Sequence, residues 1–207
     1  MLLKPPRNHP INPASFPLLA YDSTAMHTSA HLPSTNKAMH TPDALQLLLD
    51  SHRHIRASAA LAAQLGQTEG TSPSELAETA SRVIRYFTLG LPMHIEDEDY
   101  ALVPHLFATS LPEEMMRHLW ELGRQHEELE LMVDELLPLW AAVRDTPERH
   151  TELAGRLLVQ GRRLQALLED HLTLEEQQLF PLIRERLSPE TLAVIGQEIL
   201  DRRGQLS

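Results

Sequence analysis

The chain has 207 residues, a formal net charge of −11, twelve histidines and no cysteine. The negative charge argues against nucleic acid or an anionic membrane surface as a partner, because both select clustered lysine and arginine. Without cysteine the chain forms neither disulfides nor thiolate-bound metal sites, and we expect a cytoplasmic protein. No continuous apolar run is long enough to predict a membrane-spanning helix.

Residues 1–41 are expected to form an irregular or disordered N-terminal arm. This segment holds six of the fifteen prolines and shows no sustained hydrophobic period. After it the apolar residues recur at helical spacing. We therefore divide the chain into the arm, a helical domain at 42–187, and a short C-terminal helix with its tail at 188–207.

Four long amphipathic helices and one short helix are predicted after the arm. Sequences such as Ser72-Pro73-Ser74-Glu75 are typical of helix N-termini, because serine caps the free amide groups and proline suits the first turn. Gly90 and Pro92 are expected to kink the second helix. The helices are expected over about residues 41–66, 72–106, 110–143, 146–187 and 188–203. Joined by short turns, they predict an all-α, up-down-up-down four-helix bundle.

The second and fourth helices carry the same pattern, which begins at residue 94 and again 77 residues later, at residue 171. Each copy has a histidine, a glutamate at +4, an acidic residue at +5, leucine at +8, an apolar residue at +9 and proline at +10. The pairs are His94 with Glu98 and His171 with Glu175. Histidine and glutamate four residues apart lie on one face of a helix, here the apolar face.

The first and third helices each place one histidine on the inner face. The chain therefore resembles a helical hairpin used twice, and its bundle would bring four imidazoles and two carboxylates to one level of the core. Buried polar groups without partners are costly, and a bound metal supplies a common partner. The candidate ligands are His52, His94, Glu98, His126, His171 and Glu175.

Six ligand residues exceed the four of a closed zinc site. Imidazole and carboxylate without thiolate suit two iron ions, bridged by the glutamates and by an oxo or hydroxo group, with manganese or zinc as alternatives. Two six-coordinate ions would keep about two positions open, one on each, and these fit a small ligand rather than a bulky substrate.

On these residues the chain resembles the hemerythrin-like, or HHE cation-binding, family over about residues 42–187. The resemblance implies a non-haem di-iron centre that binds a diatomic ligand, oxygen or nitric oxide. Oxygen carriers of the family have a second histidine four residues after the one on the third helix, where this chain has Glu130. The set of four histidines and two glutamates is closer to the bacterial iron-centre repair subgroup, which responds to nitric oxide and has a cysteine-bearing N-terminal region not present in this sequence.

The other acidic residues and histidines receive simpler interpretations. Glu130 is expected to point inward, either as a seventh ligand or as a hydrogen-bond acceptor. His54 lies about 200° around the helix from His52 and is expected in solvent. The remaining histidines, among them His105, His118 and His150, are expected outside the site. Four acidic residues are expected on solvated helix faces: Asp97, Asp99, Glu127 and Glu128.

Three classes of function fit the predicted site. The first is a protein that binds, senses or stores oxygen, nitric oxide or iron. The second is a redox enzyme that turns over peroxide or nitric oxide or repairs iron centres, and the third is a bundle held together by structural metals. Ferritin-like proteins use Glu-x-x-His, which does not occur here. Because the sequence has no thiol or general acid that indicates an enzyme, binding or sensing is the preferred interpretation.

Overall fold

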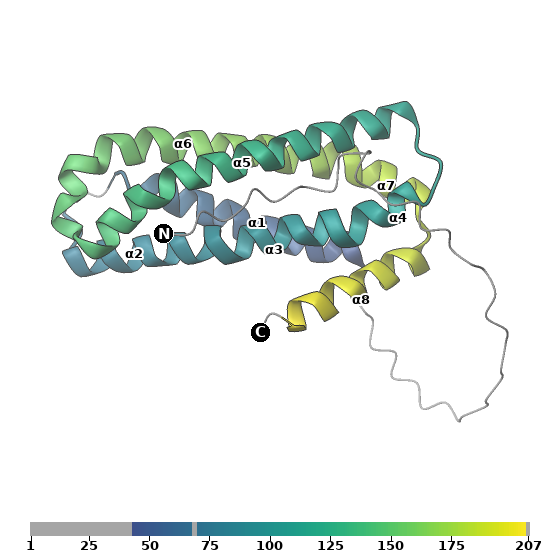
Figure 1. The fold of residues 1–207 in the computed structure, drawn as a ribbon, viewed down its shortest axis with the longest axis horizontal. Coiled ribbons are helices and arrows are strands. Elements are labelled where there is room, and N and C mark those ends of the chain that lie inside the picture. Colours follow the sequence, from purple (N-terminus) through teal and green to yellow (C-terminus); the bar gives the residue numbers. More distant parts are fainter. Residues whose placement is uncertain (1–42, 68–69, 206–207) are drawn as a thin grey trace, which may run out of the picture.

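The computed structural model of the chain describes residues 43–67 and 70–205 (Figure 1). The described residues form helices and no strand, so the all-α prediction is confirmed. The predicted arm and the predicted cap Thr41 lie outside the described residues. No helix in the described ranges is long and apolar enough to span a membrane.

The first two rods of the bundle begin at well-formed caps. Helix α1 (Ala44–Gln64) starts after Asp43, whose carboxylate accepts a hydrogen bond from the amide of Gln46 at 2.8 Å. Helix α2 (Pro73–Arg85) starts with the predicted capping box, in which Ser72 and Glu75 bond each other's backbone amides. The second rod continues through η2 (Tyr86–Gly90), α3 (Leu91–Asp97), η3 (Glu98–Leu102) and α4 (Val103–Phe107).

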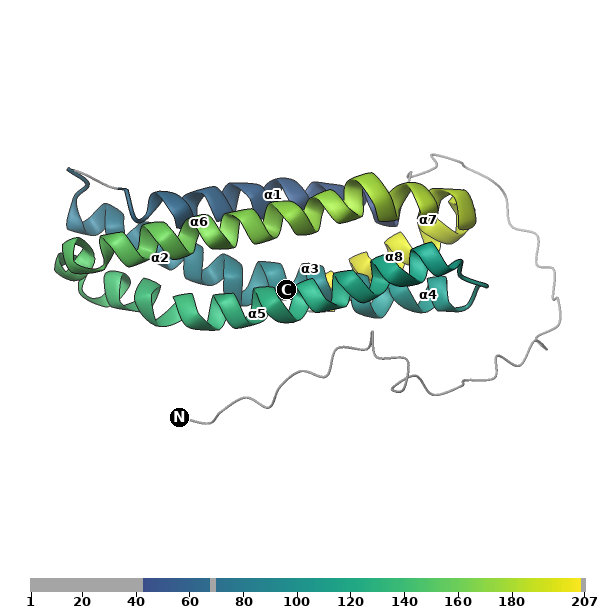
Figure 2. The ribbon, with the colours of Figure 1, turned by 90° about the horizontal axis from the view of Figure 1, so that it is seen from above.

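The third rod is one helix, α5 (Glu113–Asp145), which starts at Pro112 without a side-chain cap. The 3₁₀ turn η4 (Pro147–Arg149) leads to the fourth rod, whose segments are α6 (His150–Leu174), η5 (Glu175–Leu179) and α7 (Phe180–Arg186). The four rods run alternately along the long axis of the molecule, as Figures 1 and 2 show. In the packing, α1 lies against α6, α6 against α5, and α5 against α2.

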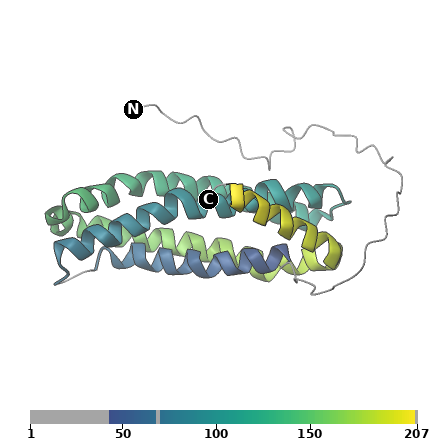
Figure 3. The same ribbon diagram turned by 90° about the horizontal axis from the view of Figure 1, so that it is seen from below.

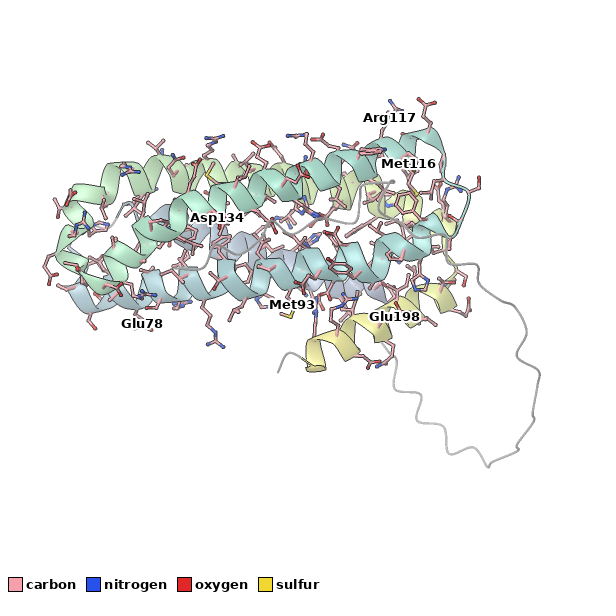
Figure 4. The ribbon with its side chains drawn as sticks, in the orientation of Figure 1. Glu78, Met93, Met116, Arg117, Asp134 and Glu198 are labelled. Carbon is pink, nitrogen blue, oxygen red and sulfur yellow. The ribbon has the colours of Figure 1, made fainter. Side chains whose placement is uncertain are left out.

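Helix α8 (Pro189–Gln205) begins where Ser188 caps the amide of Thr191. It lies obliquely across the outside of the bundle, against α1 and η3 (Figure 3). Charged side chains elsewhere, such as Glu78 and Arg117, point outward (Figure 4). The bundle therefore has four rods and one helix added to its surface.

Three π-helical turns stand where the sequence has prolines. In η3 the amide of Val103 bonds the carbonyl of Glu98, five residues back, and in η5 the amide of Phe180 bonds the carbonyl of Glu175 in the same way. Pro104 and Pro181 follow directly. Proline lacks an amide hydrogen and clashes with the carbonyl four residues earlier, so a wider turn accommodates it without breaking the helix. The kinks expected near the prolines are thus widened turns, two of which begin at a candidate ligand.

The hydrophobic core is divided into two clusters along the bundle. One contains Ile55, Ile95, Leu129 and Leu168, and the other contains Leu48, Leu102, Leu122 and Leu174, each from one of the same four rods. On every rod a buried polar residue lies between the two cluster residues named for that rod, as His52 does between Leu48 and Ile55. A polar layer therefore crosses the bundle at the junction of the two clusters.

Gly161 allows α1 and α6 to approach closely. A β-carbon placed at this position would lie 2.8 Å from the carbonyl oxygen of Ala62 and 2.9 Å from the α-carbon of Ala63. Both neighbours are backbone atoms, which cannot rotate away. Gly155 lies on the same helix and is exposed, and a β-carbon placed there would meet no atom within 4 Å.

We expect Gly161→Ala to lower the free energy of unfolding by about 1–3 kcal/mol, because the added methyl group forces the two helices apart. Gly155→Ala is the matched control and should raise the stability by about 0.5–1 kcal/mol, since alanine favours the helix without a clash. Urea denaturation followed by circular dichroism measures both changes. Equal effects of the two variants would contradict the close approach.

Candidate metal centre

The polar layer between the two hydrophobic clusters contains all six residues predicted as ligands. Every one of them is at most 2% exposed. The sequence accounts for this placement, because each lies on the apolar face of its own helix. They are His52 on α1, His94 on α3, Glu98 on η3, His126 on α5, His171 on α6 and Glu175 on η5.

Their nitrogen and oxygen atoms form two groups that could each hold a metal ion. The donor atoms within a group all lie within 4.8 Å of one another, and Glu98 belongs to both groups. The first group, called the His52–His94 group, is His52, His94, Glu98 and Glu175, and the second, called the His126–His171 group, is Glu98, His126 and His171.

Each carboxylate lies between one histidine of the first group and one of the second. Glu175 has its Oε1 2.7 Å from Nε2 of His171 and its Oε2 3.0 Å from Nε2 of His52. Glu98 has its Oε2 3.1 Å from Nε2 of His126 and its Oε1 3.6 Å from Nε2 of His94. This is the placement that a carboxylate needs in order to bridge two ions.

Several of these atoms have no partner in hydrogen-bonding geometry among the described residues. They include both ring nitrogens of His94, Nε2 of His52 and His171, and both carboxylate oxygens of Glu175. Buried polar atoms left in this state cost free energy, and native proteins contain few of them. Buried nitrogen and oxygen atoms that converge in this way fit a cation between them. Four imidazoles and two carboxylates without sulfur match the ligand preferences of iron, manganese or zinc.

The two carboxylates differ in their electrostatic surroundings. Burial raises the pKa of Glu98 well above its ordinary value, and the negative charge of Glu175 raises it further, against the opposing effect of His126. Burial also opposes ionisation of Glu175, but the imidazoles of His171 and His52 outweigh it and hold its pKa well below the usual range. Without a cation, two carboxylates this close do not ionise equally.

The histidines differ in the same way. Burial lowers the pKa of His94 and of His171, so both imidazoles are neutral and ready to bind a metal. Burial also disfavours a charged His126, but its hydrogen bonds to Asp99 and Glu98 raise the pKa to about 10. Both groups therefore hold their protons more firmly than the same groups do in water, and His126 is protonated at neutral pH.

The acidic residue at +5 of each repeat contacts a histidine on the neighbouring helix. Glu176 Oε1 lies 2.7 Å from Nδ1 of His52, and Asp99 Oδ1 lies 3.5 Å from Nδ1 of His126. A carboxylate on this nitrogen leaves Nε2 available to a bound ion and would make the imidazole a stronger ligand. The duplicated unit therefore includes the group that orients a histidine as well as the ligands.

Further polar groups support two of the histidines from outside. Arg56 donates to Glu176 at 2.8 Å, and so holds the carboxylate that contacts His52. Nδ1 of His171 lies 3.2 Å from Oε1 of Gln125. Gln125 is also part of the lining of a surface cavity of about 590 Å³ between α5 and α6, so this side of the site lies close to solvent.

Two predictions about acidic residues were wrong. Asp97 and Asp99 were expected on a solvated face, but they are 0% and 1% exposed. Asp99 faces His126, and an acidic residue at the same place in both repeats was the signal that could have revealed it. Asp97 pairs with Arg202 and Arg203 of α8, and no local pattern indicates that contact. Glu127, also expected on a solvated face, is exposed. Glu128, for which the same was expected, is half-buried.

The other candidates lie outside both groups. His54 is exposed, as predicted. Glu130 is half-buried and belongs to neither group of possible ligands among the described residues. His105 contacts Glu198 of α8 at 3.2 Å, and the buried His150 bonds the carbonyl of Leu65 at 2.6 Å, far along the bundle.

The chain matches the family model described as the hemerythrin HHE cation binding domain over residues 43–183. It therefore belongs to the hemerythrin HHE family, and the predicted family is confirmed. The matched range contains all six residues of the polar layer and ends before α8. No curated protein sequence matches the chain.

We expect metal affinity to rise with pH, because an ion must displace the protons held by Glu98 and His126, whose pKa values are raised. Each proton released makes the apparent affinity about tenfold stronger per pH unit. Zinc titrations by calorimetry at pH 6 and pH 8, in buffers of different ionisation enthalpy, give both the affinity and the number of protons released. Equal affinity at both pH values would contradict the expectation.

Asp99→Asn should weaken metal binding by about 10–100-fold, because the variant keeps the shape of the side chain but removes the charge that orients His126. The same titration at pH 7.5 measures the change. Glu127→Gln, next to His126 on the exposed side of α5, is the matched control and should bind metal as the wild type does. A loss of affinity in both variants would indicate a general effect of charge instead.

Proposed function

We propose that the chain binds two iron ions and uses them to bind or sense a diatomic ligand, oxygen or nitric oxide. The observation that carries the proposal is the position of the two carboxylates. Each contacts one histidine of the His52–His94 group and one of the His126–His171 group. Two neighbouring ions would use all six residues as ligands, whereas a single ion would leave some of them without a partner.

Iron is the favoured metal because the donor set combines imidazole and carboxylate, and because ligands from facing helices of a bundle are a common basis for di-iron sites. Iron bound there would supply redox chemistry and open positions for a small ligand. The protein contributes the other conditions. The hydrophobic clusters on either side exclude bulk water, and the acids behind His52 and His126 keep the imidazoles oriented.

A small ligand suits the surroundings better than a bulky substrate. All six residues are buried, and the cavity beside Gln125 is separated from His171 by that side chain. Oxygen and nitric oxide are small enough to reach such a site through transient openings of the packing. Reversible binding, and not turnover, is favoured because the six candidate ligands are buried and the sequence has no cysteine that could act as a redox partner.

The first test is metal analysis after anaerobic reconstitution with iron(II). We expect two irons per chain, as befits two groups of ligands. His171→Ala and Glu98→Gln should each reduce the content to one iron or fewer, while His54→Ala, on the exposed side of α1, should retain two. One iron or fewer in the wild-type protein would overturn the dinuclear proposal.

The same preparation distinguishes the three classes of function. Visible absorption spectra are recorded before and after addition of oxygen and, separately, of nitric oxide. Spectral changes that reverse when the gas is removed support binding or sensing. Consumption of nitric oxide or peroxide beyond one equivalent per site would indicate a redox enzyme, and iron that responds to neither gas would indicate a structural metal.

A further inference from the structure

Helix α8 lies outside the range that matches the family model, yet it contacts the segments that carry two of the candidate ligands. Its apolar face holds it in place, because Leu192, Ile195 and Ile199 are buried in one of the hydrophobic clusters. Glu198, labelled on α8 in Figure 4, adds a contact with His105 of α4 at 3.2 Å. The C-terminal end of the helix makes separate contacts, through two arginines.

Two arginines at this end of α8 reach the segment between His94 and Glu98. Arg203 donates from Nε to Oδ2 of Asp97 at 2.8 Å, and Arg202 donates to Oδ1 of the same carboxylate at 3.2 Å. Arg202 also bonds the carbonyl of Glu96 at 2.8 Å. Asp97 is fully buried and immediately precedes Glu98. The arginines therefore fix both a side chain and the backbone within the H-x-x-x-E segment of the first repeat.

Arg203 also ties this segment to α1. Its second contact is with the hydroxyl of Ser51, at 2.9 Å, and Ser51 immediately precedes His52. One guanidinium thus links the neighbour of His52 with the neighbour of Glu98. The contact thus joins the helices that carry His52, His94 and Glu98 of the His52–His94 group, of which only Glu98 is shared with the other group.

The second repeat has no carboxylate at the corresponding position, although the two repeats share the rest of the pattern. The position of Asp97, three residues after the histidine, is taken by Leu174, which is buried among apolar residues. A buried carboxylate is costly unless it is paired, and α8 supplies the pairing in the first repeat. The two otherwise matching repeats therefore differ at the residue that α8 contacts.

We propose that Asp97 and Arg203 are positioning residues through which α8 makes the two metal positions unequal. They hold α1 and α3 together at the His52–His94 group, so an ion there is released more slowly than it would be without α8. The His126–His171 group shares Glu98, but its two histidines lie on α5 and α6, which have no comparable contact with α8 among the described residues. The inference depends on the proposed binding of two ions.

The experiment measures the release of iron(II) from the full-length, iron-loaded protein to a chromophoric chelator under anaerobic conditions. The wild type should release its two ions in two phases of equal amplitude. His94→Ala and His171→Ala, each of which disturbs one group, assign the phases. In Arg203→Met, the phase of the His52–His94 group should become about tenfold faster, in the range of effects that outer contacts have on metal sites. The other phase should change less than twofold.

Glu198→Gln is the matched control, because it removes a different polar contact of the same helix and should leave both phases unchanged. Asp97→Asn keeps a well-packed side chain and should accelerate the same phase as Arg203→Met. The double variant should be no faster than the faster single variant, since the two residues act through one contact. Asp97→Asn also keeps the proposal testable if Arg203→Met fails to fold.

Two results would overturn the inference. The first is equal acceleration of both phases in Arg203→Met and Asp97→Asn, which indicates general loosening of the bundle. The second is an unchanged rate of release in both variants. These differ from failure of the proposed function. A wild-type protein that binds one ion or none would refute the two-iron proposal itself. A wild-type protein that binds two ions, with no selective effect of the variants, would refute only the role of α8.

Discussion

The structure depends on the burial of four imidazoles and two carboxylates at one level of an apolar bundle. Protein–protein hydrogen bonds satisfy these groups only in part, since several of the converging atoms, among them both ring nitrogens of His94, have no partner in hydrogen-bonding geometry among the described residues. Other features follow from this constraint. The hydrophobic core is divided in two, acids stand behind His52 and His126, and the glutamates of the repeats begin widened helical turns.

The sequence predicts this layer because the spacing of its residues along each helix is a local pattern, and the pattern occurs twice. Helical periodicity assigns each of the four candidate ligand histidines to the apolar face of its helix. The same pattern in two helices is hard to explain by chance. Membership of the hemerythrin HHE family is confirmed over residues 43–183, in accordance with the doubled H-x-x-x-E pattern. The capping box at Ser72 and Glu75 was predictable for the same reason, because all of its atoms lie within one turn.

Long-range contacts were not predictable in this way. Asp97 and Asp99 belong to a run of four acidic residues, which locally indicates a solvated face. Their burial depends on partners 27 or more residues away, His126 for one and the arginines of α8 for the other. The prolines indicate an irregularity in the helix, but the π-helical form that it takes here is not readable from the sequence.

The division of the core also affects how the bundle holds together. Two apolar clusters that pack on either side of a polar layer each form their own set of contacts. Where no ion is bound, the two halves are coupled through the continuous helices and through the histidine–glutamate contacts of the layer. An ion bound between rods from all sides would join the clusters into one cooperative unit. Metal binding would then make the whole bundle unfold as one unit, in addition to supplying the chemistry of the site.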